Sequence, residues 1–227
     1  KGFRMRLALL LVLSLASGCA GGEGDDTSRP DMVLSRLAFG SCSKPRWPQR
    51  LWPAIVAKRP QVWLWTGDAV YLDGDHPDLL APAYNMQLVR PEYRALLDTG
   101  VVVDGVYDDH DYGRNDAGKK LHYKERSQQA FLDFIGVPPD APRRSREGGY
   151  SSHSFGSGDK AVKVILLDTR YHRDDHVIPS IGGIRLPLSS LVACAVRWAS
   201  VFSGIGWDFE GDILGEEQWA WLEERLQ

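Results

Sequence analysis

Acidic side chains and one thiol follow the apolar segments of this chain, at the points where strands are expected to end. They are Cys42, Asp68, the neighbours Asp108 and Asp109, and Asp168. Ligands of open α/β sheets gather beyond the carboxyl ends of the strands, so these groups are expected to meet. Carboxylates that meet cannot all stay ionised unless a cation compensates them. Oxygen donors combined with a thiolate favour a pair of metal ions, one of them a transition metal.

Most of these residues also have a purely structural interpretation. Asp68 could cap the helix that follows it. Cys42 could form a disulfide with Cys194 in an exported protein. Asp168 could form a salt bridge with Arg170 at the end of a strand. The residues alone leave these alternatives open.

The segment 108–111 carries a more specific signal. Asp108, Asp109 and Asp111 surround His110. Three carboxylates this close repel one another, and a solvated turn rarely needs such an arrangement. The segment therefore favours metal binding or catalysis over a structural role.

Composition and charge restrict the class of protein. The chain has 227 residues, of which 43% are hydrophobic and 25% are charged, and this describes a globular protein of about one domain. A net charge of −3 gives no long-range attraction for nucleic acid, so specific nucleic-acid recognition is not expected and an anionic ligand must be held by local groups. Three cysteines are too few for a disulfide framework.

The first residues predict export. Positions 1–20 run from basic through apolar to small residues, as in a secretory signal peptide. The same stretch resembles a bacterial lipobox, in which Cys19 would carry a lipid anchor, and ordinary cleavage is the alternative. Residues 21–32 predict a flexible polar tether, and 33–227 the folded domain. The protein is therefore expected to be secreted, periplasmic or held at the cell surface.

Apolar runs alternate with helical periodicity along the domain. Runs that are apolar throughout indicate strands buried on both faces, as in an α/β layered sheet. Strands are predicted over 33–39, 62–65, 101–106, 150–155 and 162–167. Helices are predicted over 49–58, 79–97 with a break at Pro91, 119–135 and 216–226. The apolar segment 182–211 contains Arg197 and predicts an inserted helix packed on the domain, with membrane contact as the alternative.

Five motifs in a fixed order carry a resemblance that extends over about residues 36–226. They are FGSCS at 39–43, TGDAVY at 66–71, DDHDYG at 108–113 with NDAG at 115–118, LDTRY at 167–171 and LGEEQW at 214–219. This series resembles the PhoD-like (alkaline phosphatase D) metallophosphatases. The resemblance implies an α/β fold in which mixed β-sheets flanked by helices form a calcineurin-like sandwich.

The resemblance also implies a set of metal ligands. Asp68 would bridge two metal ions, and Cys42 and Tyr71 would bind Fe³⁺ through thiolate and phenolate. Asp109 would bind the second metal, Ca²⁺ in the pattern of the family, and Asp108 beside it is the remaining ligand candidate. A water activated by the two cations would attack the phosphorus of a phosphate ester.

Three further residues are expected to contact the phosphate. His110 would stabilise charge or protonate the leaving oxygen, and Arg170 and Asn115 would bind phosphate oxygens. The implied activity is a phosphomonoesterase or phosphodiesterase that acts on a small or polymeric ester, whose identity the sequence leaves open together with the oligomeric state.

The sequence departs from the family pattern at its end. The family places further ligands in an Asp-x-His motif beyond the tryptophan-containing helix, and no such motif follows that helix within these 227 residues. A C-terminally truncated domain is therefore expected. The alternative is an exported non-catalytic homologue or binding protein with a disulfide between Cys42 and Cys194.

Overall fold

A computed structural model describes residues 26–72, 75–176, 188–205 and 210–227 of the chain. The expected signal peptide with Cys19 lies outside the described residues, and so does part of the segment 182–211.

Six strands form two three-stranded sheets. One sheet is parallel and has the order β2-β3-β4, with β2 (Leu37–Gly40), β3 (Val62–Thr66) and β4 (Val102–Val106). The other has the order β1-β5-β6, with β1 (Asp26–Arg29), β5 (Ser151–Phe155) and β6 (Val162–Leu166). In this second sheet β1 pairs parallel with β5, and β5 pairs antiparallel with β6.

Helices connect and cover these strands. The α-helices are α1 (Trp52–Ala57), α2 (Leu80–Leu88), α3 (Pro91–Leu97), α4 (Asp109–Tyr112), α5 (Lys124–Phe134), α6 (Ser189–Ser203) and α7 (Glu216–Arg225). Single 3₁₀ turns are η1 (Pro77–Leu79), η2 (Pro142–Arg144) and η3 (Gly158–Lys160). The predicted break at Pro91 is confirmed, because this proline begins α3, where its missing N–H costs no hydrogen bond.

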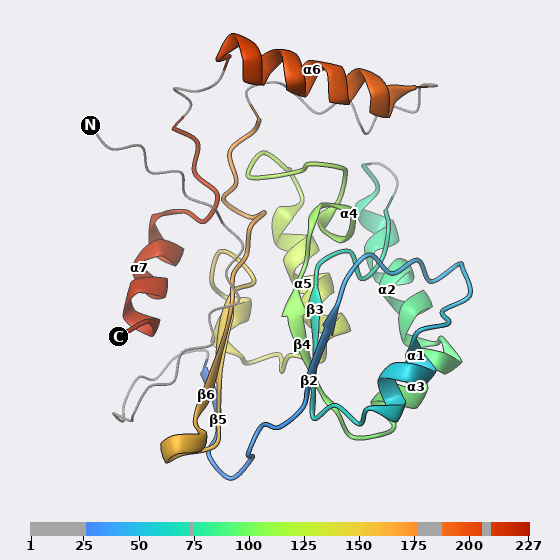
Figure 1. Ribbon diagram of the computed structural model, residues 1–227, viewed down its shortest axis with the longest axis vertical. Helices are drawn as coiled ribbons and strands as arrows, with labels where there is room; N and C mark the ends of the chain where they lie inside the picture. The colour runs from blue at the N-terminus through green and yellow to red at the C-terminus, as the bar shows by residue number, and fades with distance from the viewer. Residues whose placement is uncertain (1–25, 73–74, 177–187, 206–209) are drawn as a thin grey trace.

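The central strand β3 separates two hydrophobic clusters. Val62 and Leu64 face the second sheet and pack with Phe155 and the apolar residues of β6. Trp63 and Trp65, which alternate with them, face α1, α3 and α5. Figure 1 shows the resulting layers: α7 lies outside the second sheet, the first sheet lies on the other side of the second, and α1, α2 and α3 lie beyond the first sheet. The predicted α/β class is confirmed.

One strand lies where the sequence predicted a tether. β1 has the polar sequence DTSR and falls within 21–32. It pairs along its whole length with β5, and Thr27 Oγ1 lies 2.5 Å from His153 Nδ1. Backbone pairing with a strand more than 120 residues away fixes this segment, and no local apolar pattern announces it.

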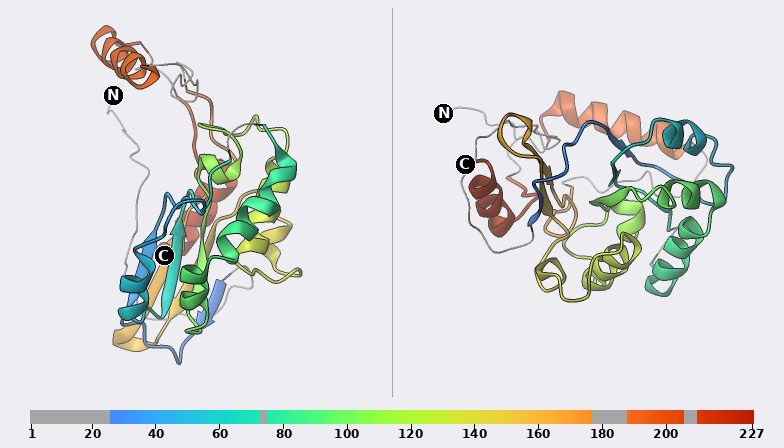
Figure 2. Two further views of the ribbon diagram at one scale, coloured as in Figure 1. Left: turned by 90° about the vertical axis from the view of Figure 1, so that its right-hand side faces the viewer. Right: turned by 90° about the horizontal axis from the view of Figure 1, so that it is seen from below.

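The helix in the segment 182–211 differs from the expectation. α6 forms, but it does not pack on the domain: Trp198 is 58% and Phe202 80% exposed, and the helix stands apart from the two sheets in Figure 2. The two rings stack on each other instead, with centroids 5.6 Å apart. Among the described helices, none combines the length and apolar content needed to cross a membrane.

A buried ionic network ties the two sheets together. Asp104 of β4 accepts hydrogen bonds from Arg143 Nη1 at 2.8 Å and from His153 Nε2 of β5 at the same distance. Arg143 also donates to the carbonyl oxygens of Gly105 and Gly149. Burial opposes ionisation of Asp104, but the Arg143 guanidinium and the His153 imidazole outweigh it and hold the pKa of this carboxyl well below its usual range.

Removing the charge of Asp104 is expected to destabilise the fold. In the Asp104→Asn variant the buried guanidinium of Arg143 loses its counter-charge, and unpairing a buried charge costs about 3–5 kcal/mol. Because the folded-state pKa is depressed, this stabilisation is present above the unfolded pKa of about 3.9 and is lost as pH falls below it. Urea unfolding at several pH values measures both effects.

The exposed Asp159 gives a matched control. Asp159→Asn should change the free energy of unfolding by about 0.5 kcal/mol at most. A similar free energy of unfolding for Asp104→Asn and Asp159→Asn at pH 7 would contradict the role given to the network.

Candidate functional site

The three parallel strands end at the same edge of their sheet. Gly40 at the end of β2 pairs with Trp65, and Thr66 at the end of β3 pairs with Val106 at the end of β4. The loops that follow these strands therefore start side by side. The convergence predicted for the groups after these strands is confirmed.

A cluster of potential metal ligands lies in these loops. Asp68, Asp109 and His110 each place one ligand atom within 4.8 Å of the others. Cys42 Sγ lies 3.8 Å from Asp68 Oδ2. The Tyr71 hydroxyl lies near the side chains of Asp68 and Cys42, and its ring centroid is 4.4 Å from that of His110. These five residues are called the ligand cluster below.

Backbone strain shapes the two loops that carry the thiol and the first carboxylate. Cys42 and Asp68 both have left-handed backbones, with φ of 57° and 50°. The Ser43 N–H donates to the Asp68 carbonyl oxygen at 2.8 Å, which joins the loops. Left-handed non-glycine residues cost about 1–3 kcal/mol each and gather at functional sites.

Gly67 allows the close approach of the third loop. Its φ is +99°, and a Cβ atom added to it would lie 2.4 Å from Cβ of Asp108. Only glycine leaves room for the segment after β4 at this position. The Gly-Asp pair in the sequence thus serves the packing of the two loops as well as the chemistry of Asp68.

A fully buried carboxylate that was predicted neither as a metal ligand nor as a phosphate contact holds the site in place. Asp111 accepts hydrogen bonds from the backbone N–H of Ala69 at 2.9 Å and of Asp108 at 2.6 Å. The second bond belongs to the capping box that starts α4. Asp111 thereby joins the loop after β3 to the loop after β4, and it positions Asp68 and Asp109 relative to each other.

Arg170 supplies positive charge beside the ligand cluster. Its Nε forms an ion pair with Asp108, and its Nη2 lies 3.8 Å from Asp109 Oδ1. Its Nη1 is buried and has no hydrogen-bond partner among the residues that the structure describes. Asp108, predicted as a metal ligand, is therefore engaged by Arg170, while the N–H groups of Arg170 Nη1 have no acceptor among the described residues.

Asp168 fixes the backbone around Arg170. Its carboxylate accepts hydrogen bonds from the backbone N–H groups of Gly149, Arg170 and Tyr171 and from the hydroxyl of Tyr107. It does not pair with the guanidinium of Arg170, so the predicted strand-end salt bridge is wrong. Four donors from three loops satisfy this carboxylate, and the guanidinium of Arg170 faces Asp108 instead.

Asn115 is connected to Asp109 through Asp116. Its side-chain amide donates to Asp116 at 2.6 Å, and the Asp116 backbone N–H donates to Asp109 Oδ2 at 2.7 Å. In this structure Asn115 thus acts on the loop that orients Asp109.

Two side chains of the ligand cluster have raised pKa values. Burial raises the pKa of Asp68, and the neighbouring Asp108 and Asp109 raise it further. Burial also raises the pKa of the Tyr71 hydroxyl, as do its contacts with Cys42 and Asp68. Among the described residues, Asp68 accepts hydrogen bonds from the Cys42 thiol and from the backbone N–H of His110, and neither donor brings a full positive charge.

Cys42 and Cys194 are not bridged. Cys42 and Cys194 are both free and exposed, and Cys194 lies on α6. The predicted alternative of a disulfide between them is wrong, because the thiol of Cys42 lies against Asp68 in the ligand cluster.

Comparisons with protein-family models, with curated proteins and with solved structures found no match for this chain. What the chain does must therefore be inferred from the chemistry of the ligand cluster and its surroundings.

Gly67→Ala is expected to destabilise the protein more than the same change at Gly100. Both glycines have positive φ, but a Cβ at Gly100 meets nothing within 4 Å. The left-handed backbone alone costs about 1–2 kcal/mol, and displacing Asp108 should cost about 1–3 kcal/mol more. Urea unfolding of the two variants compares these costs, and equal losses would show that the close approach at Gly67 has no energetic weight.

Proposed function

We propose that this protein is a metal-dependent phosphoric ester hydrolase built on a calcineurin-like sandwich, as the resemblance to the PhoD-like metallophosphatases implies. One observation carries the proposal. Acidic, thiol, phenol and imidazole groups meet in the ligand cluster, and a buried guanidinium N–H with no partner in the described structure lies beside them. Cation ligands and an anion donor side by side suit a phosphate ester.

The donor set fits two different cations. Asp68 would bridge them, the Cys42 thiolate and Tyr71 phenolate would hold Fe³⁺, and Asp109 would hold Ca²⁺. Nδ1 of His110 is buried without a partner among the described residues, and this is a further polar atom that the present contacts leave unsatisfied. When bound, the cations would neutralise phosphate oxygens and make a water more acidic.

Two side chains of the protein act directly on the phosphate ester. Arg170 donates its free Nη1–H to a phosphate oxygen, while its Nε stays on Asp108. Hydrolysis breaks the bond from phosphorus to the alcohol oxygen, joins a water oxygen to phosphorus, and returns one proton to the alcohol. The His110 imidazole, held against the Tyr71 ring, delivers that proton to the leaving oxygen.

The surrounding architecture supports the same proposal. Two sheets pack face to face with helices on both outer sides, and the ligand cluster lies at the carboxyl ends of the parallel strands. Export of the protein, with a lipid on Cys19, stays a prediction from the sequence and is part of the proposal.

The activity test is release of phosphate from p-nitrophenyl phosphate. The protein loaded with Fe³⁺ and Ca²⁺ should hydrolyse the ester, and Asp68→Asn should lower kcat/KM by at least about 100-fold because the bridging carboxylate is lost. A chelator should lower it similarly. Asp159→Asn should keep the wild-type rate, and full activity in Asp68→Asn would overturn the site assignment.

Alkylation of the thiols tests metal binding without relying on turnover. Cations bound at Asp68 should protect Cys42 from iodoacetamide by at least about tenfold in rate, because a metal-bound thiolate is a poor nucleophile. Cys194 on α6 reacts in the same sample and serves as the internal control. Mass spectrometry of the two peptides measures each rate. Equal rates at Cys42 with and without the metals would exclude the thiolate as a ligand.

A further inference from the structure

A cavity adjoins the ligand cluster. It has a volume of about 550 Å³, which falls in the range of small-molecule sites. Tyr71 belongs to both, since it forms part of the cavity wall while its hydroxyl lies near Asp68 and Cys42. A molecule held at the ligand cluster can therefore extend past Tyr71 into this cavity, called the side pocket below.

One wall of the side pocket is apolar. Val70 and Leu72 come from the loop after β3 and are 1% and 5% exposed, and Leu79, Pro82 and Met86 come from η1 and α2. These side chains offer hydrocarbon and a polarisable sulfur, which suit an aromatic ring or an aliphatic chain.

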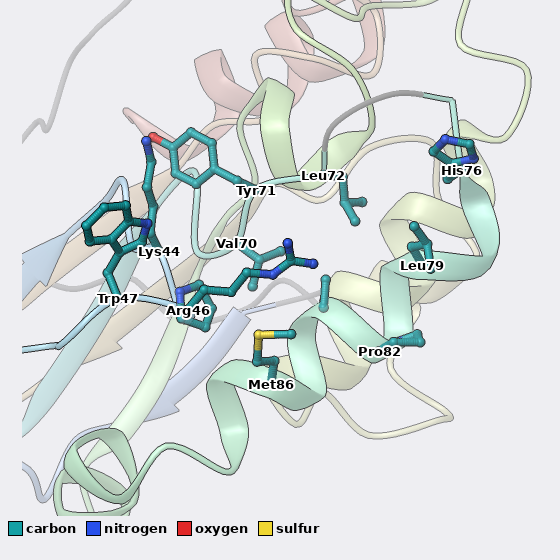
Figure 3. Close-up of a pocket in the computed structure, with 12 residues that line it drawn as sticks. Lys44, Arg46, Trp47, Val70, Tyr71, Leu72, His76, Leu79, Pro82 and Met86 are labelled. Atoms are coloured by element: carbon teal, nitrogen blue, oxygen red, sulfur yellow. The ribbon is translucent and has the colours of Figure 1, made fainter.

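The opposite wall is cationic. Lys44 and Arg46 come from the loop after β2, and neither forms an ion pair with a carboxylate of the described chain. Lys44 Nζ lies 4.6 Å from the centroid of the Tyr71 ring, at the border with the ligand cluster. Figure 3 shows the Arg46 side chain extending into the pocket, away from Lys44. No carboxylate is among the residues described as lining the pocket.

We propose that the side pocket binds the alcohol part of the substrate, and that the substrate is a phosphate ester of an apolar, ring-containing alcohol that carries a second anionic group. The apolar wall takes the ring, and Arg46 pairs with the second anion through its planar guanidinium. This inference rests on the proposed hydrolysis at the ligand cluster. It assigns Arg46 to the choice of substrate and leaves the reacting phosphate to Arg170.

Three esters separate the contributions. Methyl phosphate reaches only the ligand cluster, 2-naphthyl phosphate adds the ring, and 6-carboxy-2-naphthyl phosphate adds the second anion. Arg46→Gln should lower kcat/KM for the carboxylated ester about tenfold more than for 2-naphthyl phosphate. Met86→Ser should lower kcat/KM for both naphthyl esters about tenfold more than for methyl phosphate. Each variant is compared with wild type on the same ester, so differences in leaving-group strength cancel.

Arg50→Gln is the matched control, because Arg50 is an exposed arginine in the same loop between β2 and α1 and is not among the residues that line the pocket. For this variant, kcat/KM should stay close to the wild-type value for each of the three esters. If Arg46→Gln also affects the two naphthyl esters equally while the wild type hydrolyses all three, the side pocket does not read the second anion and the inference falls.

Binding of the product alcohol separates this inference from the proposed function. Fluorescence titration with 6-hydroxy-2-naphthoate needs no turnover and should give a Kd about tenfold weaker for Arg46→Gln than for wild type. If no ester is hydrolysed but this difference is found, the proposed function fails and the pocket stands. If esters are hydrolysed and the wild type does not bind 6-hydroxy-2-naphthoate, the pocket assignment fails alone.

Discussion

The repulsion between two neighbouring buried carboxylates is the constraint on which the rest of the site depends. Asp68 and Asp109 are each 7% exposed, and their ligand atoms lie within 4.8 Å of each other. At an effective dielectric of about 20, two negative charges at that separation repel by roughly 3 kcal/mol. Arg170 offsets the charge on Asp109, but among the described residues the hydrogen-bond donors of Asp68 are a thiol and a backbone N–H. Burial and the neighbouring carboxylates raise the pKa of Asp68, and the cation of the proposed function would oppose that rise.

Much of the fold could be predicted because its central elements are marked locally. The apolar run of β3 and the proline that begins α3 lie where the sequence placed them. β1 could not be predicted, because its polar residues are ordered by backbone pairing with β5, and the stabilising partner lies far along the chain. The prediction that α6 packs on the domain was wrong for a related reason. Periodicity shows that a helix forms, but it does not show which surface, if any, covers its apolar side chains.

The positions of the candidate ligands could be predicted from the sequence, but the residues that hold those ligands in place could not. Strand ends announce Asp68 and Asp109 because parallel strands end at one edge. The tasks of Asp111 and Asp168 are different: each accepts backbone N–H groups from loops that are distant in sequence, such as those at Ala69 and Gly149. All of these residues are aspartates in motifs of similar appearance. Only the hydrogen-bond donors around each carboxylate distinguish the structural ones from those left free to bind a cation.

The two sheets contribute opposite charges to the site, and this makes their packing part of its chemistry. Asp68 and Asp109 follow strands of the parallel sheet, whereas Arg170 follows β6 of the second sheet. The distance between the ligand cluster and the guanidinium therefore depends on how closely the sheets approach. The apolar contacts of β3 with β6 set that approach, and the buried pairing of Asp104 with His153 holds it from the other strands. Residues outside the site thus set the distance between the ligand cluster and Arg170, and the proposed binding of one phosphate by both depends on that distance.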